Sequence, residues 1–233
     1  MNDLPQHKKA ERMAHHTDLV LVHGLYFASD EPTAKDTGNA IGTARQQAFT
    51  ENGKVLGVYA YEWLDGRGKP LANRMLQRLR GTAPAVEAVE IITLHEAGLR
   101  ASLASESGRA LWRQVASCEP YGLDTRRSFT LIGKPRQLLD GPAGSQRVIW
   151  FGNGLIQLSR AEFIQHYTTR HGPLVAGHAG LIGLKRYRQV PAEHNELCAS
   201  LCELGLGQGP APAVFAELEM GAPPLKLRSE ERR

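Results

Sequence analysis

Two side chains that can exchange protons lie one helical turn apart in the second half of the chain. Tyr167 and His171 are four residues apart in the stretch EFIQHYTTRHGPLV, residues 162–175. On a helix this spacing places both on one face. A neutral imidazole can accept a proton near pH 7, and a phenol can donate a hydrogen bond to a developing oxyanion. The pair therefore predicts acid/base chemistry on a small molecule, such as proton abstraction next to a carbonyl, dehydration or decarboxylation.

The residues around this pair predict a pocket that is mostly apolar. On a straight helical wheel, Phe163 and Leu174 fall on the same side as Tyr167, and His166 lies at the boundary of that side. Tyr187, in the strand expected next, offers a second phenol to the pocket, with cross-strand packing as its alternative role. The candidate catalytic residues are His171, Tyr167 and Tyr187, and the candidate substrate-binding residues are Phe163, His166 and Leu174.

The helix that carries these residues has a regular start and an irregular end. Ser159 and Glu162 have the spacing of a capping box, which fixes where the helix begins. At the other end, Pro173 follows Gly172 and removes one backbone hydrogen bond, so we expect the helix to kink or step at about His171. The imidazole of His171 then either caps a freed backbone carbonyl or points into a pocket between the helix and the sheet.

The sequence contains no fingerprint of a cofactor or of a metal ion. The glycines near Gly152 do not have the spacing of a dinucleotide-binding loop, and there is no P-loop lysine. His166 and His171 are five residues apart and diverge on a helix, while His23 and His95 lie on separate predicted strands. No set of three metal ligands can be assembled from these positions. We therefore expect neither a cofactor nor a metal.

Composition and charge narrow the classes of partner. The net charge is +4 and the basic residues are scattered, so nucleic acid is not an implied partner. No apolar run approaches the roughly 18 to 20 residues of a membrane span, and the N-terminal residues lack the apolar core of a signal peptide, so we expect a cytoplasmic protein without membrane contact. Three cysteines do not suggest a disulfide framework; Cys198 and Cys202 are either small packing residues or a metal or redox pair.

The apolar periodicity predicts an α+β protein built from two similar halves. Setting aside a short helix at 71–81, residues 18–134 read as strand, helix, strand, strand, helix, strand, the order of a ferredoxin-like unit. Residues 1–17 form a flexible tail, and residues 135–146 have the composition of a linker. Residues 147–233 repeat the first three steps only. The second unit therefore lacks its last strand, or another segment fills the place.

The region 147–190 resembles the EthD family. The shared pattern is an apolar strand, a Leu-Ser-x-x-Glu-Phe helix start, an aromatic residue, a His-Gly-Pro-Leu run and a strand with an Arg-Tyr-x-Gln ending. Here these elements are Leu158, Ser159, Glu162, Phe163, Tyr167, His171, Gly172, Pro173, Leu174, Arg186, Tyr187 and Gln189. The resemblance implies a ferredoxin-like unit of the dimeric α/β-barrel class, in which two sheets pack around a central pocket. Because the chain holds two units, we expect such a barrel to form within one chain.

These observations lead to two hypotheses about function. In the first, the chain is an EthD-like enzyme of catabolic or polyketide-type metabolism that acts on a small hydrophobic or aromatic molecule by acid/base chemistry in an apolar pocket. The resemblance implies an oxidoreductase, and the chemistry of the tyrosine and histidine residues suits a dehydratase or a decarboxylase; in each case we expect no cofactor. In the second, the chain is a non-catalytic accessory protein that binds a hydrophobic molecule in the same pocket. The sequence leaves open whether the chain is a monomer or forms a homodimer.

Overall fold

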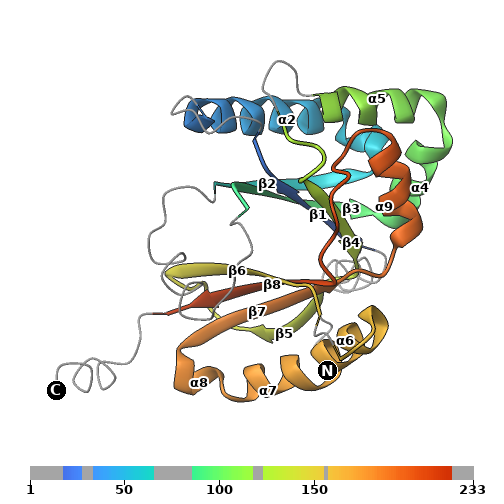
Figure 1. Cartoon of the computed structure of the whole chain (residues 1–233). Helices are drawn as coiled ribbons and strands as arrows, with labels where there is room; N and C mark the ends of the chain where they lie inside the picture. Colours follow the sequence, from blue (N-terminus) through green and yellow to red (C-terminus); the bar gives the residue numbers. More distant parts are fainter. Residues whose placement is uncertain (1–17, 28–33, 66–85, 118–122, 155–156, 222–233) are drawn as a thin grey trace, which may run out of the picture. The chain divides into compact units, whose positions relative to one another are not determined.

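The computed structural model describes residues 18–27, 34–65, 86–117, 123–154 and 157–221. It shows an α+β protein with two four-stranded antiparallel sheets (Figure 1). The chain forms two compact units: one extends to Thr130 and includes Glu196–Pro210, and the other comprises Leu131–Asn195 and the described residues from Ala211 onward. The predicted tail, 1–17, and the short helix predicted at 71–81 lie outside the described residues.

The first sheet has the strand order β2-β3-β1-β4. Its strands are β1 (Asp18–Leu25), β2 (Val58–Asp65), β3 (Ala88–His95) and β4 (Phe129–Gly133). β1 pairs with β3 in antiparallel register along its whole length, and β2 pairs with the other edge of β3. This order and the alternation with helices are consistent with the ferredoxin-like arrangement predicted for the first half.

Helices cover one face of the first sheet (Figure 1). They are α2 (Ala34–Leu56), α4 (Glu96–Ala104) and α5 (Glu106–Ser117). α2 ends at Gly57, whose φ of 76° is a left-handed conformation that favours glycine. Trp112 of α5 is fully buried, and its indole N–H donates to the hydroxyl of Ser102 at 3.0 Å. That bond and the buried indole hold α5 against α4.

The second sheet has the order β5-β7-β8-β6. Its strands are β5 (Arg136–Asp140), β6 (Gln146–Gly152), β7 (Leu184–Pro191) and β8 (Val214–Met220). β6, β7 and β8 are arranged as β1, β2 and β3 are in the first sheet. The fourth strand, β5, pairs with β7, at the opposite edge from the one that β4 occupies beside β1.

The prediction of a linker over 135–146 is therefore wrong for residues 136–140, and the second sheet does not lack a fourth strand. Two apolar side chains explain why this short segment pairs with the sheet. Leu138 and Leu139 are half-buried and pack against the core of the second unit. Of the glycine and proline residues that suggested a linker, Pro135 lies just before the strand, and Gly141, Pro142 and Gly144 lie after it, in the turn toward β6.

Helix α9 (Asn195–Glu203) lies between β7 and β8 in the sequence but belongs to the first unit. Its Glu196 accepts a hydrogen bond from Arg100 of α4 at 3.1 Å. The sequence pattern had assigned all of 147–233 to the second unit. Cys198 and Cys202 of α9 do not form a disulfide, and the S–H of Cys202 donates to the carbonyl of Gly207 at 2.8 Å.

Candidate functional site

The helix that carries the candidate residues changes its winding in the middle. It consists of α6 (Arg160–His166), the π-helical turn η1 (Tyr167–His171) and α7 (Gly172–Gly177), and the short α8 (Ala179–Ile182) follows. The N–H of Gly172 bonds to the carbonyl of Tyr167, five residues earlier. Gly172 and Pro173 do not end the helix. The step expected at about His171 takes the form of this π-helical turn.

Side chains at both ends of α6 support this winding. The capping box is confirmed: the Glu162 carboxylate accepts the backbone N–H of Ser159 at 2.8 Å, and the Ser159 hydroxyl accepts the N–H of Glu162 at 3.3 Å. The hydrogen bonds from Ser159 lower the pKa of Glu162. At the π-helical turn, the hydroxyls of Thr168 and Thr169 donate to carbonyls one turn earlier at 2.8 and 2.7 Å. Such bonds from a threonine hydroxyl to a carbonyl one turn earlier often accompany a bend in a helix.

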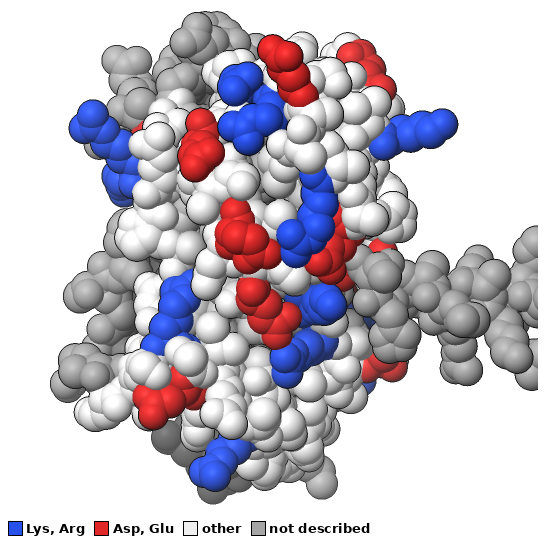
Figure 2. Space-filling model, turned by 90° about the vertical axis from the view of Figure 1, so that its right-hand side faces the viewer, with Lys and Arg blue, Asp and Glu red and all other residues white. Residues whose placement is uncertain are grey.

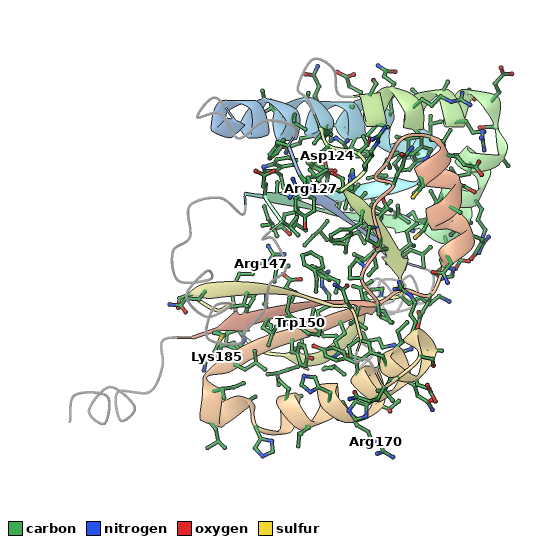
Figure 3. The ribbon with its side chains drawn as sticks, in the orientation of Figure 1. Asp124, Arg127, Arg147, Trp150, Arg170 and Lys185 are labelled. Carbon is green, nitrogen blue, oxygen red and sulfur yellow. The ribbon has the colours of Figure 1, made fainter. Side chains whose placement is uncertain are left out.

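The π-helical turn decides which residues face the sheet. One extra residue in a turn rotates everything after it by about 100° relative to a straight α-helix. Phe163 and Tyr167 are buried, but the buried position in α7 is Gly172, and Leu174 is 61 % exposed. Arg170 points away from the sheet (Figure 3). The expectation that Leu174 lies with Phe163 on the buried face is therefore wrong.

At Gly172 the helix comes into close contact with the sheet. A Cβ at this position would lie 2.6 Å from Cδ1 of Leu138 and 2.7 Å from Nε2 of Gln189. Both distances are shorter than Cβ contacts in proteins allow. Leu138 belongs to β5 and Gln189 to β7, so the glycine admits a side chain from each of two neighbouring strands. A side chain at this position would therefore have to displace the ends of Leu138 and Gln189.

Gln189 begins a row of buried polar groups that ends at Tyr167. Its amide Nε2 donates to the hydroxyl of Tyr187 at 2.6 Å, and the Tyr187 hydroxyl lies 3.4 Å from that of Tyr167, which is long for an O–H···O bond. In this contact the Tyr187 hydroxyl is the donor and the Tyr167 hydroxyl the acceptor, so the hydrogen of Tyr167 is left for another acceptor. Burial raises the pKa of Tyr167, so this phenol stays protonated at neutral pH.

The ring of Tyr167 stacks against two other rings. Its centroid is 5.0 Å from that of Trp150 and 4.6 Å from that of His171. Trp150 comes from β6 (Figure 3), where Gly152 leaves room for the indole: a Cβ at Gly152 would lie 2.3 Å from it. Trp150 is a site residue that the sequence analysis did not identify. The alternation of the β6 segment gave a signal, since it places Trp150 on the same face as Val148 and Gly152.

His171 lies at the exposed edge of this stack. Partial burial lowers its pKa below the ordinary 6.5, and the neighbouring His166 lowers it further, so the imidazole is neutral at pH 7 and can accept a proton. Across the described part of the chain, no contact joins His171 to a backbone carbonyl. The carbonyl cap is made by His178, whose Nδ1 lies 2.8 Å from the oxygen of Leu174.

The structure thus brings together four of the six predicted site residues. His171, Tyr167 and Tyr187 are linked through the ring and the hydroxyl of Tyr167, and Phe163 packs beside them in the same core. His166 and Leu174 are both exposed. Gln189 was missed as a site residue although it belongs to the pattern that resembles EthD.

Other classes of site are not found in the described ranges. There, no group of three or more histidine, cysteine or acidic residues is arranged to hold a metal ion. No helix in those ranges has the length and apolar character needed to cross a membrane. On the face shown in Figure 2, basic and acidic side chains are interspersed.

Comparison with known proteins gives no further information on this site. No protein-family model matches the sequence, and no curated protein matches it.

The first prediction concerns Gly172. We expect Gly172→Ala to lower the free energy of unfolding by about 1–3 kcal/mol, because the added methyl group must displace Leu138 and Gln189. Gly177→Ala is the matched control in the same helix, since a Cβ there meets nothing within 4 Å. We expect it to be neutral or slightly stabilising. Urea unfolding of both variants checks this, and equal stabilities would contradict the close contact.

The second prediction concerns the protonation of His171. The charge of His166 lowers the pKa of His171, so His166→Asn should raise that pKa and move the loss of the proton to higher pH. An NMR titration that follows the imidazole Cε1–H of His171 measures the shift. His178→Asn serves as the control and should leave the His171 titration in place. A pKa of His171 that does not change in His166→Asn would show that the two imidazoles do not interact.

Proposed function

We propose that this chain is an EthD-like enzyme that acts on a small aromatic or hydrophobic carbonyl compound by acid/base chemistry, with His171 as the proton acceptor and Tyr167 as the hydrogen-bond donor. The observation that carries the proposal is the position of Tyr167. Its ring stacks on the imidazole of His171, and its hydroxyl lies next to that of Tyr187. A neutral base and a protonated phenol therefore occur side by side.

The reaction class follows from the two protonation states. An imidazole nitrogen of His171 takes a proton from the carbon next to the substrate carbonyl, and the electrons of that C–H bond form the double bond of an enolate. The enolate oxygen accepts a hydrogen bond from the hydroxyl of Tyr167. Return of the proton from His171 at a different position completes an isomerisation, and its transfer to a β-hydroxyl group that leaves as water completes a dehydration. In a decarboxylation the electrons of the enolate come from the C–CO2 bond of a β-keto acid, and the enolate carbon then takes up a proton. Trp150, which is partly exposed, offers aromatic surface to the substrate.

The same proposal includes the architecture of the family. Two four-stranded sheets in an α+β chain support a pair of ferredoxin-like units that form a dimeric-α/β-barrel-like arrangement within one chain. In the second unit, β5 stands in for the strand that the repeat lacks. A crystal structure in which the two sheets do not face each other would contradict this part of the proposal.

A second candidate is a non-catalytic protein that binds a hydrophobic molecule. The burial of the two phenols supports it, since Tyr187 is 1 % exposed and Tyr167 is 7 % exposed. In this case the aromatic stack holds a ligand, and the contact between the hydroxyls only fixes the packing of the rings. The two candidates differ in whether bound carbonyl compounds lose a proton.

The third prediction tests this difference without knowledge of the natural substrate. Acetophenone and its ring-hydroxylated derivatives carry exchangeable hydrogens next to a carbonyl, and the uncatalysed exchange of these hydrogens is slow. In D2O we expect the protein to catalyse their exchange for deuterium, followed by proton NMR. His171→Ala should lower the exchange rate by roughly 100-fold, the size expected for loss of a general base. Tyr167→Phe should lower it by roughly 10-fold or more, because the oxyanion loses a donor.

Controls separate chemistry from folding. His178→Ala removes an exposed imidazole on the same helical segment and should keep the full exchange rate. Thermal unfolding of each variant shows whether the fold is kept. Binding of these ketones without any protein-dependent exchange would favour the binding protein, and exchange that survives in His171→Ala would remove His171 from the catalytic role.

A further inference from the structure

The first unit contains a buried polar cluster that the proposed chemistry of the second unit does not use. Glu90 of β3 is fully buried, and its carboxylate accepts hydrogen bonds from three side chains. The donors are His23 Nδ1 at 2.9 Å, Arg45 Nη1 at 2.7 Å and the Tyr61 hydroxyl at 2.8 Å. They come from β1, α2 and β2, so the cluster lies between the helix and the sheet.

His23 and His95 do not meet across the sheet of the first unit. His23 lies opposite Glu90 in the register of β1 and β3, whereas His95 lies opposite Asp18 at the other end of β1 and contacts its carboxylate at 3.1 Å. Each imidazole is paired with a carboxylate. Of the two, His23 is 1 % exposed, and the side chain of His95 is 55 % exposed.

The contacts determine which nitrogen of His23 carries the hydrogen. Nδ1 lies 2.9 Å from Oε2 of Glu90 and 3.3 Å from Nη1 of Arg45. Arg45 Nη1 already donates to the same Oε2 at 2.7 Å. The carboxylate needs donors, so Nδ1 carries the hydrogen and Nε2 carries the free lone pair. Burial lowers the pKa of His23, which keeps the imidazole neutral, and Arg45 is the main cause that keeps the pKa of Glu90 low despite its burial.

Two buried polar atoms in this row of the sheet have no hydrogen-bond partner within the described residues: Nε2 of His23 and Nε1 of Trp63. Trp63 of β2, Glu90 and His23 stand opposite one another on three adjacent strands. An unpaired buried acceptor or donor costs about 1–3 kcal/mol. A cluster that served stability alone would be expected to satisfy its polar atoms, and most buried polar atoms in proteins are satisfied. The open lone pair of Nε2 thus calls for a hydrogen-bond donor.

The surroundings of this row favour an aromatic donor. Along the same face of the sheet, Trp63 packs against an apolar cluster whose buried members are Leu25, Phe27, Ile41 and Ala88. His23 and Trp63 each lie two residues before the last residue of their strand, so the row is near one end of the sheet. Glu90 and Arg45 neutralise each other, which disfavours a charged ligand. An apolar cluster beside an unpaired acceptor, Nε2 of His23, and an unpaired donor, Nε1 of Trp63, suits a neutral ring that carries a hydroxyl group, because a hydroxyl group can both donate and accept.

We propose that this cluster is a second binding site, specific for a small aromatic alcohol whose O–H donates to Nε2 of His23 while Glu90 holds the imidazole in place. The site lies in the first unit and does not depend on the enzyme activity proposed for the second. Its hydrogen bond requires the Nδ1–H form of the imidazole, so the site has a property that can be measured before any ligand is added.

The fourth prediction uses phenol as the probe and toluene as the same ring without the hydroxyl. In full-length protein labelled with 15N-histidine, long-range proton–nitrogen NMR should show hydrogen on Nδ1 of His23. Phenol should shift the Nε2 resonance in a saturable way, and toluene should not. His23→Phe should weaken phenol binding roughly tenfold, the effect of one lost buried hydrogen bond. His95→Phe, the matched change on the neighbouring strand, should leave binding unaltered.

Three results would overturn the proposal. They are hydrogen on Nε2 in the free protein, an Nε2 resonance that phenol does not move, and a toluene response as large as that of phenol. None of the three needs a substitution, so they decide the question even where His23→Phe does not fold. His171→Ala should keep the phenol response at His23, which separates failure of this site from failure of the proposed enzyme.

Discussion

The second unit is organised around the close contact of helix and sheet at Gly172. With no side chain at this position, Leu138 of β5 and Gln189 of β7 reach the backbone of the helix. Gln189 is thereby held where its amide donates to Tyr187, and Tyr187 in turn faces Tyr167. A methyl group at 172 would displace the ends of Leu138 and Gln189, and Gln189 is the donor to Tyr187. Gly172 therefore leaves room for the side chain that donates a hydrogen bond to Tyr187.

The π-helical turn makes this contact compatible with an accessible histidine. In a straight helix, the face that buries Phe163 and Tyr167 would continue to Leu174. The added residue brings Gly172 to the sheet instead and leaves His171 at the exposed edge, where its ring still stacks on Tyr167. Pro173 fits this turn because it has no N–H that would need a regular helical acceptor. The helix thus remains continuous through residues that usually end helices.

Local patterns made part of this structure predictable. Ser159 and Glu162 specify the helix start through bonds within four residues, and the spacing of Tyr167 and His171 already placed them together. The remaining features depend on contacts between distant segments. β5 pairs with a strand more than 40 residues later, and the hydroxyl of Tyr167 accepts a hydrogen bond from Tyr187 on that same strand. The cluster of His23 requires the register of β1 against β3, which apolar alternation alone does not determine.

The direction of hydrogen bonding between the two phenols of the second unit links the packing at Gly172 to the proposed chemistry. Neutron diffraction from deuterium-exchanged crystals of the unliganded protein observes it directly. The account predicts deuterium on the Tyr187 oxygen pointing toward Tyr167, and the deuterium of Tyr167 pointing away from Tyr187. Deuterium of Tyr167 pointing at the Tyr187 oxygen, with the amide of Gln189 reversed, would contradict it, because Tyr167 would then have no free hydrogen to offer a substrate.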